Sequence, residues 1–295
     1  MALPNLFIVG AAKSGTTSLH NYLHQHPDVF MCNPKEPHYL INQEIGINRI
    51  PVGITNFIEY TDLFSEGEDK KYRGESSVMY LMYPEIVIPK IKNQFGEDSK
   101  IIIMLRNPVE RAYSGYQHVK RYNVMESLSF EQALEKSENR YHNTSNMTPA
   151  SRYLELGMYF EQVKIFIEEF DNVHVIIYDD YKNDFSSEMD NVFKFLDVDA
   201  FKVNTEEKYM VGGWEWKNKK TKALLMSSNR LKTLLKIVLP SQILRTFIRK
   251  KIMEYSISKT PKINENTRKY LCKYYAQDVK KLSKLIGINL NHWTL

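Results

Sequence analysis

The segment Phe7–Leu23 reads FIVGAAKSGTTSLHNYL, and its order of residue types decides the fold. An apolar run ends at Val9, a short loop contains Gly10 and Gly15, and an amphipathic stretch begins at Thr16. Small residues let such a loop wrap an oxyanion, and the first N–H groups of the following helix point at that anion. The segment therefore predicts a strand, an anion-binding loop and a helix.

The lysine of this loop does not stand where an ATPase carries it. The glycine spacing matches a P-loop, but Thr16 and Thr17 occupy the positions of the usual Lys-Ser/Thr pair, and the lysine is Lys13 inside the loop. The next clear strand, Lys100–Leu105, is followed by Arg106 rather than by a metal-binding aspartate. This pattern indicates a site that neutralises phosphate charge directly and needs no magnesium.

A second anion site is expected directly after that strand. Asn107 is a natural N-cap and Pro108 suits the first position of a helix, so a helix should begin here. Ser114 then lies about two turns into the helix, on the side of Arg106, where both groups can bind a phosphate. The alternative is that Arg106 and Arg111 simply pair with surface acids.

The rest of the chain alternates strand and helix patterns, which is typical of a parallel sheet covered by helices on both faces. We expect one α/β domain of the P-loop type over residues 1–295, with a basic helical C-terminal segment from about residue 221. Expected strands are 6–9, 28–31, 100–105 and 173–178, the last one buried; expected helices are 16–25, 84–95, one from 108, 152–170, and those after 221, broken at Pro240 and Pro261.

Composition places the chain among ordinary globular proteins. It has 295 residues, of which 43% are apolar and 25% charged, which excludes disordered, collagen-like and coiled-coil classes. Cys32 and Cys272 are too few for a disulfide framework. An apolar run begins at Leu3, leaving no room for a signal peptide, and no run approaches the ~18 apolar residues of a membrane span. A cytoplasmic protein is expected.

Charge is distributed unevenly. Residues 214–295 contain 19 lysines and arginines against four acidic residues, a net charge of +15, whereas the remainder contains 21 against 31, or −10. A basic C-terminal segment suggests an anionic ligand, polymer or membrane surface. The alternative is that these charges belong to solvated helix faces.

Two motifs together resemble a known family. GAAKSGTTSL at 10–19, followed by LRNPVERAYSGY at 105–116, is similar to sulfotransferases that use 3′-phosphoadenosine 5′-phosphosulfate, PAPS. The resemblance implies PAPS as co-substrate and no metal. VIIYDDYKND at 175–184 and YMVGGWEWKNK at 209–219 extend it. It implies the following contacts: Lys13, Ser14, Gly15, Thr16, Thr17 and Ser18 at the 5′-phosphosulfate, Arg106 and Ser114 at the 3′-phosphate, Tyr178 near the adenine, and Lys217 or Lys219 closing over the 3′-phosphate.

The acceptor side is suggested by NPKEPHYL at 33–40, which resembles the Lys-Glu-Pro-His-aromatic segment of heparan-type carbohydrate sulfotransferases. Pro37 favours an extended Glu36, and extended residues two apart share a face, so Glu36 and His38 should point into one cleft. The resemblance implies Glu36 as general base, with His38 as the second candidate and Lys13 stabilising the leaving phosphate. The alternative is a turn whose acid and histidine are merely solvated.

A further stretch, GESSVMYL at 74–81, resembles the Glu-Lys-Ser/Thr-Pro-x-Tyr stretch of the family. Ser76 stands where heparan-type enzymes carry a lysine. Tyr80, Tyr83 and Tyr153 either line an acceptor cleft or pack in the core with their hydroxyls at its rim.

We therefore expect a metal-independent sulfotransferase that moves a sulfuryl group from PAPS to a hydroxyl or amine. The expected acceptor is a saccharide or glycolipid, possibly anionic, with no nucleic-acid partner, and the basic C-terminal segment offers peripheral membrane contact. Two alternatives stay open. One is an ATP-dependent small-molecule kinase on the same scaffold, and the other is a non-catalytic protein that binds anionic polymers.

Overall fold

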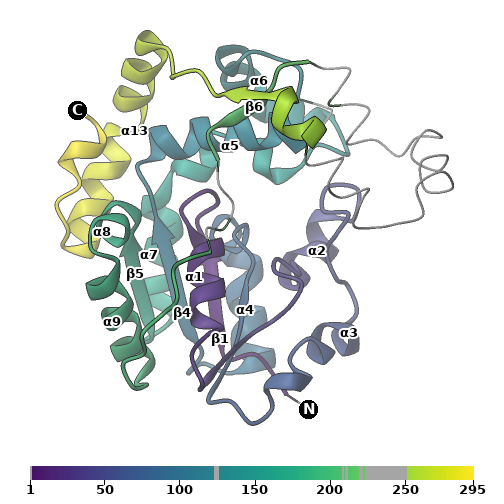
Figure 1. The fold of residues 1–295 in the computed structure, drawn as a ribbon, viewed down its shortest axis with the longest axis vertical. Coiled ribbons are helices and arrows are strands. Elements are labelled where there is room, and N and C mark those ends of the chain that lie inside the picture. The colour runs from purple at the N-terminus through teal and green to yellow at the C-terminus, as the bar shows by residue number, and fades with distance from the viewer. Residues whose placement is uncertain (1, 123–125, 208, 210–211, 219–221, 223–250) are drawn as a thin grey trace, which may run out of the picture.

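The computed structural model describes residues 2–122, 126–207, 209, 212–218, 222 and 251–295 (Figure 1). Lys219 and most of the segment from Thr221 to residue 250, including Pro240, lie outside the described residues.

A five-stranded sheet forms the centre of the protein. Its strands lie in the order β2-β3-β1-β4-β5, and every neighbouring pair is parallel. A small antiparallel ribbon, β6 with β7, lies apart from this sheet. The bounds are β1 Leu6–Gly10, β2 Val29–Met31, β3 Tyr72–Ser76, β4 Lys100–Leu105, β5 Val173–Ile177, β6 Trp214–Trp216 and β7 Ile257–Lys259.

Helices connect the strands and cover the sheet (Figure 1). Between β1 and β4 the chain forms α1 Thr16–Leu23, α2 Tyr39–Ile45, α3 Phe57–Asp62 and α4 Pro84–Phe95. After β4 it forms α5 Pro108–Tyr122, α6 Phe130–Asn143, α7 Tyr159–Glu169, α8 Tyr178–Asn183, α9 Phe185–Leu196 and α13 Glu265–Ile286.

Successive side chains of a strand point to opposite faces of the sheet, and a hydrophobic core covers each face. Phe7 and Val9 of β1 face the core formed with α4, α5, α7 and α13, whereas Leu6 and Ile8 face the core formed with α1 and α9. All four side chains are fully buried. Because both faces of β1 are covered, its residues read as one continuous apolar run, as parallel strands usually do. The predicted α/β class, a parallel sheet flanked by helices, is confirmed.

The order of the strands creates a crevice above β1 and β4. The chain leaves the end of β1 toward β2 on one side of the sheet, and it leaves the end of β4 toward β5 on the other. At such a point the connecting loops diverge, and ligands of open α/β sheets bind outside the carboxyl ends of the two strands. Both predicted anion-binding segments begin at these two ends.

Most of the predicted elements are confirmed, several to the residue. Strand 100–105 and helix 84–95 are as expected, and Asn107 caps α5 by accepting from the N–H of Val109 at 2.9 Å. Strand 173–178 ends one residue early. It is an edge strand rather than a fully buried one, because Val173, His174 and Val175 are only partly covered.

The expected helix over 152–170 is wrong in its first third. Glu155–Gly157 form a single 3₁₀ turn, and α7 begins only at Tyr159. The cause lies in α13, which sequence patterns of this segment do not reveal. The hydroxyl of Tyr275 donates to the carbonyl of Leu154 at 3.1 Å, and Asp278 accepts the N–H of Tyr159 at 2.9 Å. These contacts take groups that a continuous helix would pair internally.

The predicted helical C-terminal segment is confirmed only in part among the described residues: residues 251–256 and α13, which follows Pro261, are helical, whereas Ile257–Lys259 between them form strand β7 and pair with β6. Among the described residues, no helix combines the length and the apolar character that crossing a bilayer demands.

Candidate active site

The loop after β1 is held against the end of β4. The N–H of Ala11 donates to the carbonyl of Met104 at 2.7 Å, and the guanidinium of Arg106 donates to the carbonyl of Lys13 at 3.3 Å. Lys13 and Gly15 both have positive φ angles, 69° and 97°, which turn the loop tightly before α1 begins. The two predicted anion-binding segments are therefore in direct contact.

Gly15 is required by its neighbour Tyr178 as well as by its φ angle. A Cβ atom at position 15 would lie 2.9 Å from two ring carbons of Tyr178, closer than packed atoms approach. The guanidinium of Arg106 lies over the same ring, 5.0 Å from its centroid. Tyr178 thus contacts both Gly15 and Arg106, and its expected contact with the adenine stays a prediction.

The hydroxyl residues of the loop differ in accessibility. The side chains of Ser14 and Thr16 are buried, whereas those of Thr17 and Ser18 are partly exposed in the first turn of α1. The N–H of Ser18 already donates to the carbonyl of Gly15 at 3.0 Å. The assignment of these residues to a phosphosulfate stays a prediction.

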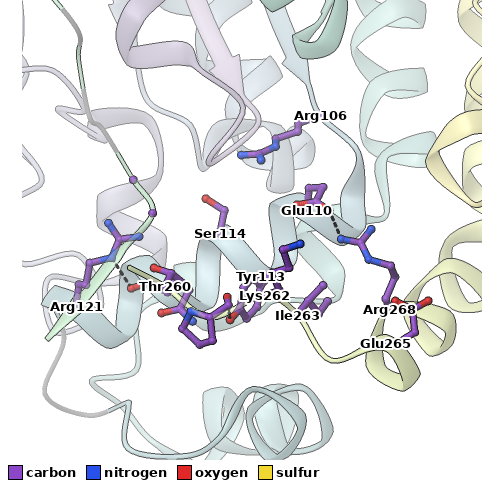
Figure 2. Close-up of a pocket in the computed structure, with 14 residues that line it drawn as sticks. Arg106, Glu110, Tyr113, Ser114, Arg121, Thr260, Lys262, Ile263, Glu265 and Arg268 are labelled. Atoms are coloured by element: carbon purple, nitrogen blue, oxygen red, sulfur yellow. Dashed lines mark hydrogen bonds and ion pairs between the residues drawn. The ribbon is translucent and has the colours of Figure 1, made fainter. Parts of the chain in front are cut away.

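A cavity of about 710 Å³ opens beside Arg106 (Figure 2). Arg106 and Ser114 both line it, as the predicted second anion site requires, and Figure 2 shows their side chains turned toward the same space. Further cations of the lining are Arg121, Lys262 and Arg268. Its volume is in the range of pockets that hold small ligands.

Lys217 takes no part in this cavity. Its amino group donates to the carbonyl of Tyr255 at 3.0 Å, and the residue is absent from the lining. The other candidate for the same role, Lys219, lies outside the described residues. The described glycines of that loop, Gly212 and Gly213, do line the cavity, so the predicted loop is in place although Lys217 points elsewhere.

The amino group of Lys13 faces a histidine that the sequence had not singled out. Its Nζ atom lies 3.3 Å from Nδ1 of His118 on α5. Burial, with nearby Arg121 and other cations, lowers the pKa of Lys13 to about 8, although the Glu36 carboxylate opposes this effect. Burial, with Lys13 and Arg121, also lowers the pKa of His118 to about 4. At neutral pH, Lys13 is therefore charged and His118 neutral.

Glu36 and His38 do come together, but not as the sequence suggested. Oε2 of Glu36 lies 3.5 Å from Nε2 of His38, and Oε1 lies 2.6 Å from Nζ of Lys35. The expected extended conformation is wrong, because Glu36 and His38 have φ angles of 64° and 51°. Hydrogen bonds from distant residues determine this loop, among them the one from the N–H of Ile54 to the carbonyl of Pro37 at 2.8 Å.

The carboxylate of Glu36 is held in its ionised form. Burial opposes its charge, but the adjacent Lys35 and His38 outweigh that effect and hold the pKa of Glu36 well below its usual range. Its side chain is still 38% exposed and can be reached from outside. Its charge opposes the lowering of the pKa of Lys13 and of His118, so the three groups share one electrostatic environment.

Ser76, which stands where heparan-type enzymes carry a lysine, is buried. Its hydroxyl oxygen lies 2.8 Å from Nδ1 of His20. No cation occupies this position. The cation nearest to the Glu36 carboxylate is instead supplied by Lys35.

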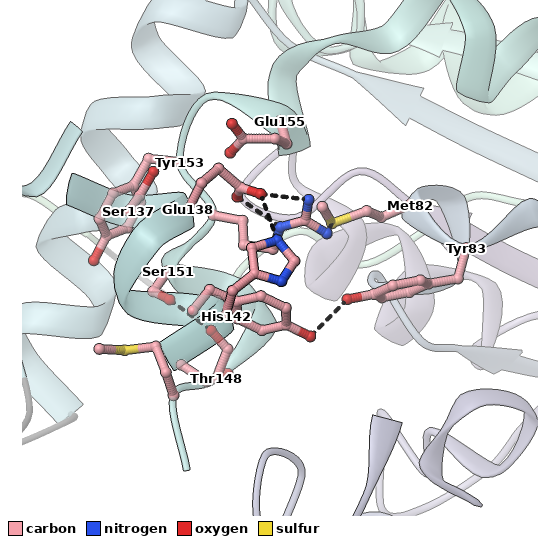
Figure 3. Close-up of polar contacts among 12 residues, drawn as sticks. Met82, Tyr83, Ser137, Glu138, His142, Thr148, Ser151, Tyr153 and Glu155 are labelled. Atoms are coloured by element: carbon pink, nitrogen blue, oxygen red, sulfur yellow. Dashed lines mark hydrogen bonds and ion pairs between the residues drawn. The ribbon is translucent and has the colours of Figure 1, made fainter. Parts of the chain in front are cut away.

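Two of the three candidate cleft tyrosines belong to the core. Tyr80 and Tyr153 are fully buried, and their hydroxyls donate to Glu75 at 2.9 Å and to Glu126 at 2.6 Å. Tyr83 is half-buried and its hydroxyl lies 3.2 Å from that of Tyr141, within a polar cluster around Glu138 and Arg152 (Figure 3). For Tyr80 and Tyr153 the core-packing alternative is correct.

In the part of the chain that the structure describes, no group of three or more His, Cys, Asp or Glu side chains is arranged to hold a metal ion.

A family model described as "Sulfotransferase domain" matches residues 3–283. This match agrees with the loop after β1 and with the cavity beside Arg106. The chain belongs to the sulfotransferase family. A crystal structure of a sulfotransferase from Alicyclobacillus acidocaldarius is similar over the full length of both chains, with 28% identity and a TM-score of 0.74.

Several curated relatives of this sulfotransferase chain are named for carbohydrate substrates. Human "Carbohydrate sulfotransferase 15" is 27% identical over 247 residues, which is 66% of this chain and 44% of the relative. "Bifunctional heparan sulfate N-deacetylase/N-sulfotransferase 1" of Caenorhabditis elegans is 26% identical over 213 residues, 70% of this chain and 24% of the relative. The chain thus spans less than half of the length of these relatives.

Sequence reasoning missed His118, Lys262 and Arg268. His118 had a usable signal, because it lies four residues after Ser114 and therefore one turn further along the same face of α5. Lys262 and Arg268 had none, because the segment before α13 and α13 itself reach the cavity through tertiary packing.

We predict that Gly15→Ala destabilises the protein more than Gly46→Ala does. Both glycines have positive φ angles, 97° and 91°, so alanine is strained at each, by about 1–3 kcal/mol. A Cβ atom at position 46 meets nothing within 4 Å, whereas one at position 15 meets the Tyr178 ring. Denaturant unfolding of both variants measures the difference, and equal losses would contradict the close packing of Gly15 on Tyr178.

Proposed function

We propose that this protein transfers a sulfuryl group from PAPS to a hydroxyl or amine of a carbohydrate acceptor. The observation that carries this proposal is the contact between Arg106 and the carbonyl of Lys13, which joins the loop after β1 to the cavity lined by Ser114. A ligand with phosphate at both ends of one nucleoside fits such a joined site, because each end finds its own donors.

This geometry supports a proposal for the residues that hold the nucleotide. In the proposal the 5′-phosphosulfate lies on the loop of residues 13–18 at the start of α1, and the 3′-phosphate lies between Arg106 and Ser114. Tyr178 supports the base side of the site, since Arg106 already lies over its ring. Because Lys217 bonds to the carbonyl of Tyr255, Lys262 and Arg268 of the cavity lining are better placed to complete the 3′-phosphate site.

Proton and charge movements are assigned to three side chains. Glu36 accepts the proton of the acceptor hydroxyl as its oxygen attacks sulfur, and the bond from sulfur to the 5′-phosphate oxygen breaks in line. Lys13 lies where negative charge develops on that leaving oxygen and stabilises it. His118 accepts a hydrogen bond from Lys13 through its neutral ring and so orients the amino group. His38 stays the second candidate for the base.

Two observations support a sugar as acceptor. The His118 ring lies 4.9 Å from the ring of Tyr122, which meets Trp214 at 6.3 Å, so aromatic rings extend outward from Lys13. Tyr122 is 45% exposed, and exposed aromatic rings suit the apolar faces of sugars. The names of the human and C. elegans relatives point to the same class of acceptor. The cytoplasmic location and a membrane contact of the C-terminal segment stay predictions.

We predict that adenosine 3′,5′-bisphosphate raises the melting temperature, whereas ATP with magnesium does not. At a 100-fold excess over its Kd a ligand stabilises the folded state by about 2.7 kcal/mol. Ser114→Ala should weaken binding of the bisphosphate about tenfold or more, because a hydrogen bond to a charged group contributes about 1.5–3 kcal/mol. Binding of adenosine 5′-phosphate, which lacks the 3′-phosphate, is the control and should not change. Stabilisation and hydrolysis of ATP that depend on magnesium would favour the kinase alternative.

We predict different defects in Glu36→Gln and Lys13→Ala. Glu36→Gln should abolish transfer of labelled sulfate while the Kd of the bisphosphate stays within about twofold, since the amide cannot take the proton. Lys13→Ala should lower kcat at least ~10²-fold, as loss of one oxyanion donor does. Isothermal titration and rate measurements on both variants test this. Full turnover by Glu36→Gln would end its assignment as base.

The pH dependence should follow Lys13. Because its pKa is lowered to about 8, the free enzyme loses this positive charge above that pH, and kcat/KM for PAPS should fall as pH rises through about 8. The limb in kcat should lie at higher pH, because bound anions favour the protonated amine. In Lys13→Arg the limb should disappear from this range, since arginine stays charged. An unchanged limb in Lys13→Arg would contradict the assignment.

A further inference from the structure

A fully buried carboxylate lies beneath the loop that carries Glu36. Glu75, the second-to-last residue of strand β3, is inaccessible to solvent. Three hydroxyls donate to it: Tyr60 at 2.6 Å and Tyr80 at 2.9 Å to Oε1, and Ser77 at 2.6 Å to Oε2. Burial raises the pKa of Glu75, although the three hydroxyl donors and His38 favour its charged form. A buried charge is tolerated only when it is compensated in this way.

Two of these hydroxyls also bind the main chain of the Glu36 loop. The N–H of His38 donates to the Ser77 hydroxyl oxygen at 3.0 Å, and the N–H of Leu40 donates to the Tyr80 hydroxyl oxygen at 3.1 Å. Glu75 is therefore connected to the loop at two points, each time through a single hydroxyl group. Tyr60, the third donor, stacks its ring on Tyr39 at 4.3 Å, and its hydroxyl bonds to Glu75 without a bond to either of these N–H groups.

The loop requires such support because its conformation is costly. Glu36 and His38 both have positive φ angles, a backbone conformation that is strained in residues other than glycine. His38 is also the N-cap residue of α2, and its side chain caps no N–H group there. The first N–H groups of a helix need partners from elsewhere, and Ser77 and Tyr80 supply two of them.

A carboxylate suits this position for a chemical reason. An ionised carboxylate only accepts hydrogen bonds, so each hydroxyl must turn its proton toward Glu75. The oxygen lone pairs of Ser77 and Tyr80 are then left to accept from the N–H groups of the loop. A glutamine at position 75 would offer an NH₂ group to one hydroxyl and reverse that bond.

We propose that Glu75 is a positioning residue, which fixes residues 36–40 through Ser77 and Tyr80 and thereby aims the Glu36 carboxylate at the acceptor. The inference rests on the proposed function, in which Glu36 takes the proton. Glu75 itself touches neither substrate, since it is buried below the loop.

The test compares the hydroxyls of Ser77 and Tyr80, which bind both Glu75 and the loop, with the hydroxyl of Tyr60, which binds Glu75 alone. Ser77→Ala and Tyr80→Phe each remove a bond to Glu75 and a bond to the loop, whereas Tyr60→Phe removes a bond to Glu75 alone and keeps its ring. We expect kcat for sulfate transfer to fall about 10- to 100-fold in the first two, as small misplacements of reacting groups do, and by less than about twofold in Tyr60→Phe. The melting temperature should fall in all three, and the Kd of adenosine 3′,5′-bisphosphate should stay unchanged.

Other outcomes overturn the proposal. Equal losses of kcat in Tyr60→Phe and Tyr80→Phe would mean that the cluster only stabilises the fold. A loss of affinity for adenosine 3′,5′-bisphosphate in parallel with the loss of kcat would mean that the substitutions disturb the proposed nucleotide site and not only the Glu36 loop. Unchanged kcat in all three variants would show that the loop needs no such support.

Glu36→Gln separates this inference from the proposed function. If that variant keeps normal turnover, the assignment of the base fails and the positioning of Glu36 fails with it. If that variant is inactive while Ser77→Ala and Tyr80→Phe behave like Tyr60→Phe, the proposed function stands and only the positioning role of Glu75 is lost.

Discussion

The N–H of Ala11 donates to the carbonyl of Met104 across 2.7 Å, and this bond fastens the loop after β1 to the end of β4. It exists because β1 and β4 are neighbours in a parallel sheet, so that their carboxyl ends meet at one edge. Arg106 follows two residues after Met104 and reaches the carbonyl of Lys13 from there. If another strand stood between β1 and β4, the two anion-binding segments would lie about 10 Å apart, since neighbouring strands are spaced by 4.7–4.9 Å.

The features that could be predicted from the sequence are those that a short segment determines without contacts to distant residues. The glycine spacing and the apolar run of β1 specify a strand, loop and helix locally, and Asn107 with Pro108 specifies where α5 begins. Glu36 shows the limit: its neighbour Pro37 suggested extended backbone, but contacts with Ile54, Ser77 and Tyr80 set a different one. Those partners lie 17 or more positions away from the loop residues that they bind, and no local pattern contains them.

The same limit applies to the cations of the cavity. Arg106 was predictable because it ends a strand with a clear pattern, whereas Arg268 reaches the cavity from α13, where it pairs with Glu110 of α5. The motif that contains Lys217 was identified, but its register against β7 determines where the lysine points. The N–H of Lys217 donates to the carbonyl of Ser256 at 2.9 Å, and its side chain turns to Tyr255. Pairing partners of short antiparallel strands are tertiary information.

The cavity beside Arg106 is built from three separate parts of the chain, residues 106–121, Gly212 with Gly213, and residues 260–268. During synthesis the ribosome releases the first part long before the last. The cavity can therefore form only after α13 has been synthesised and has packed on α5.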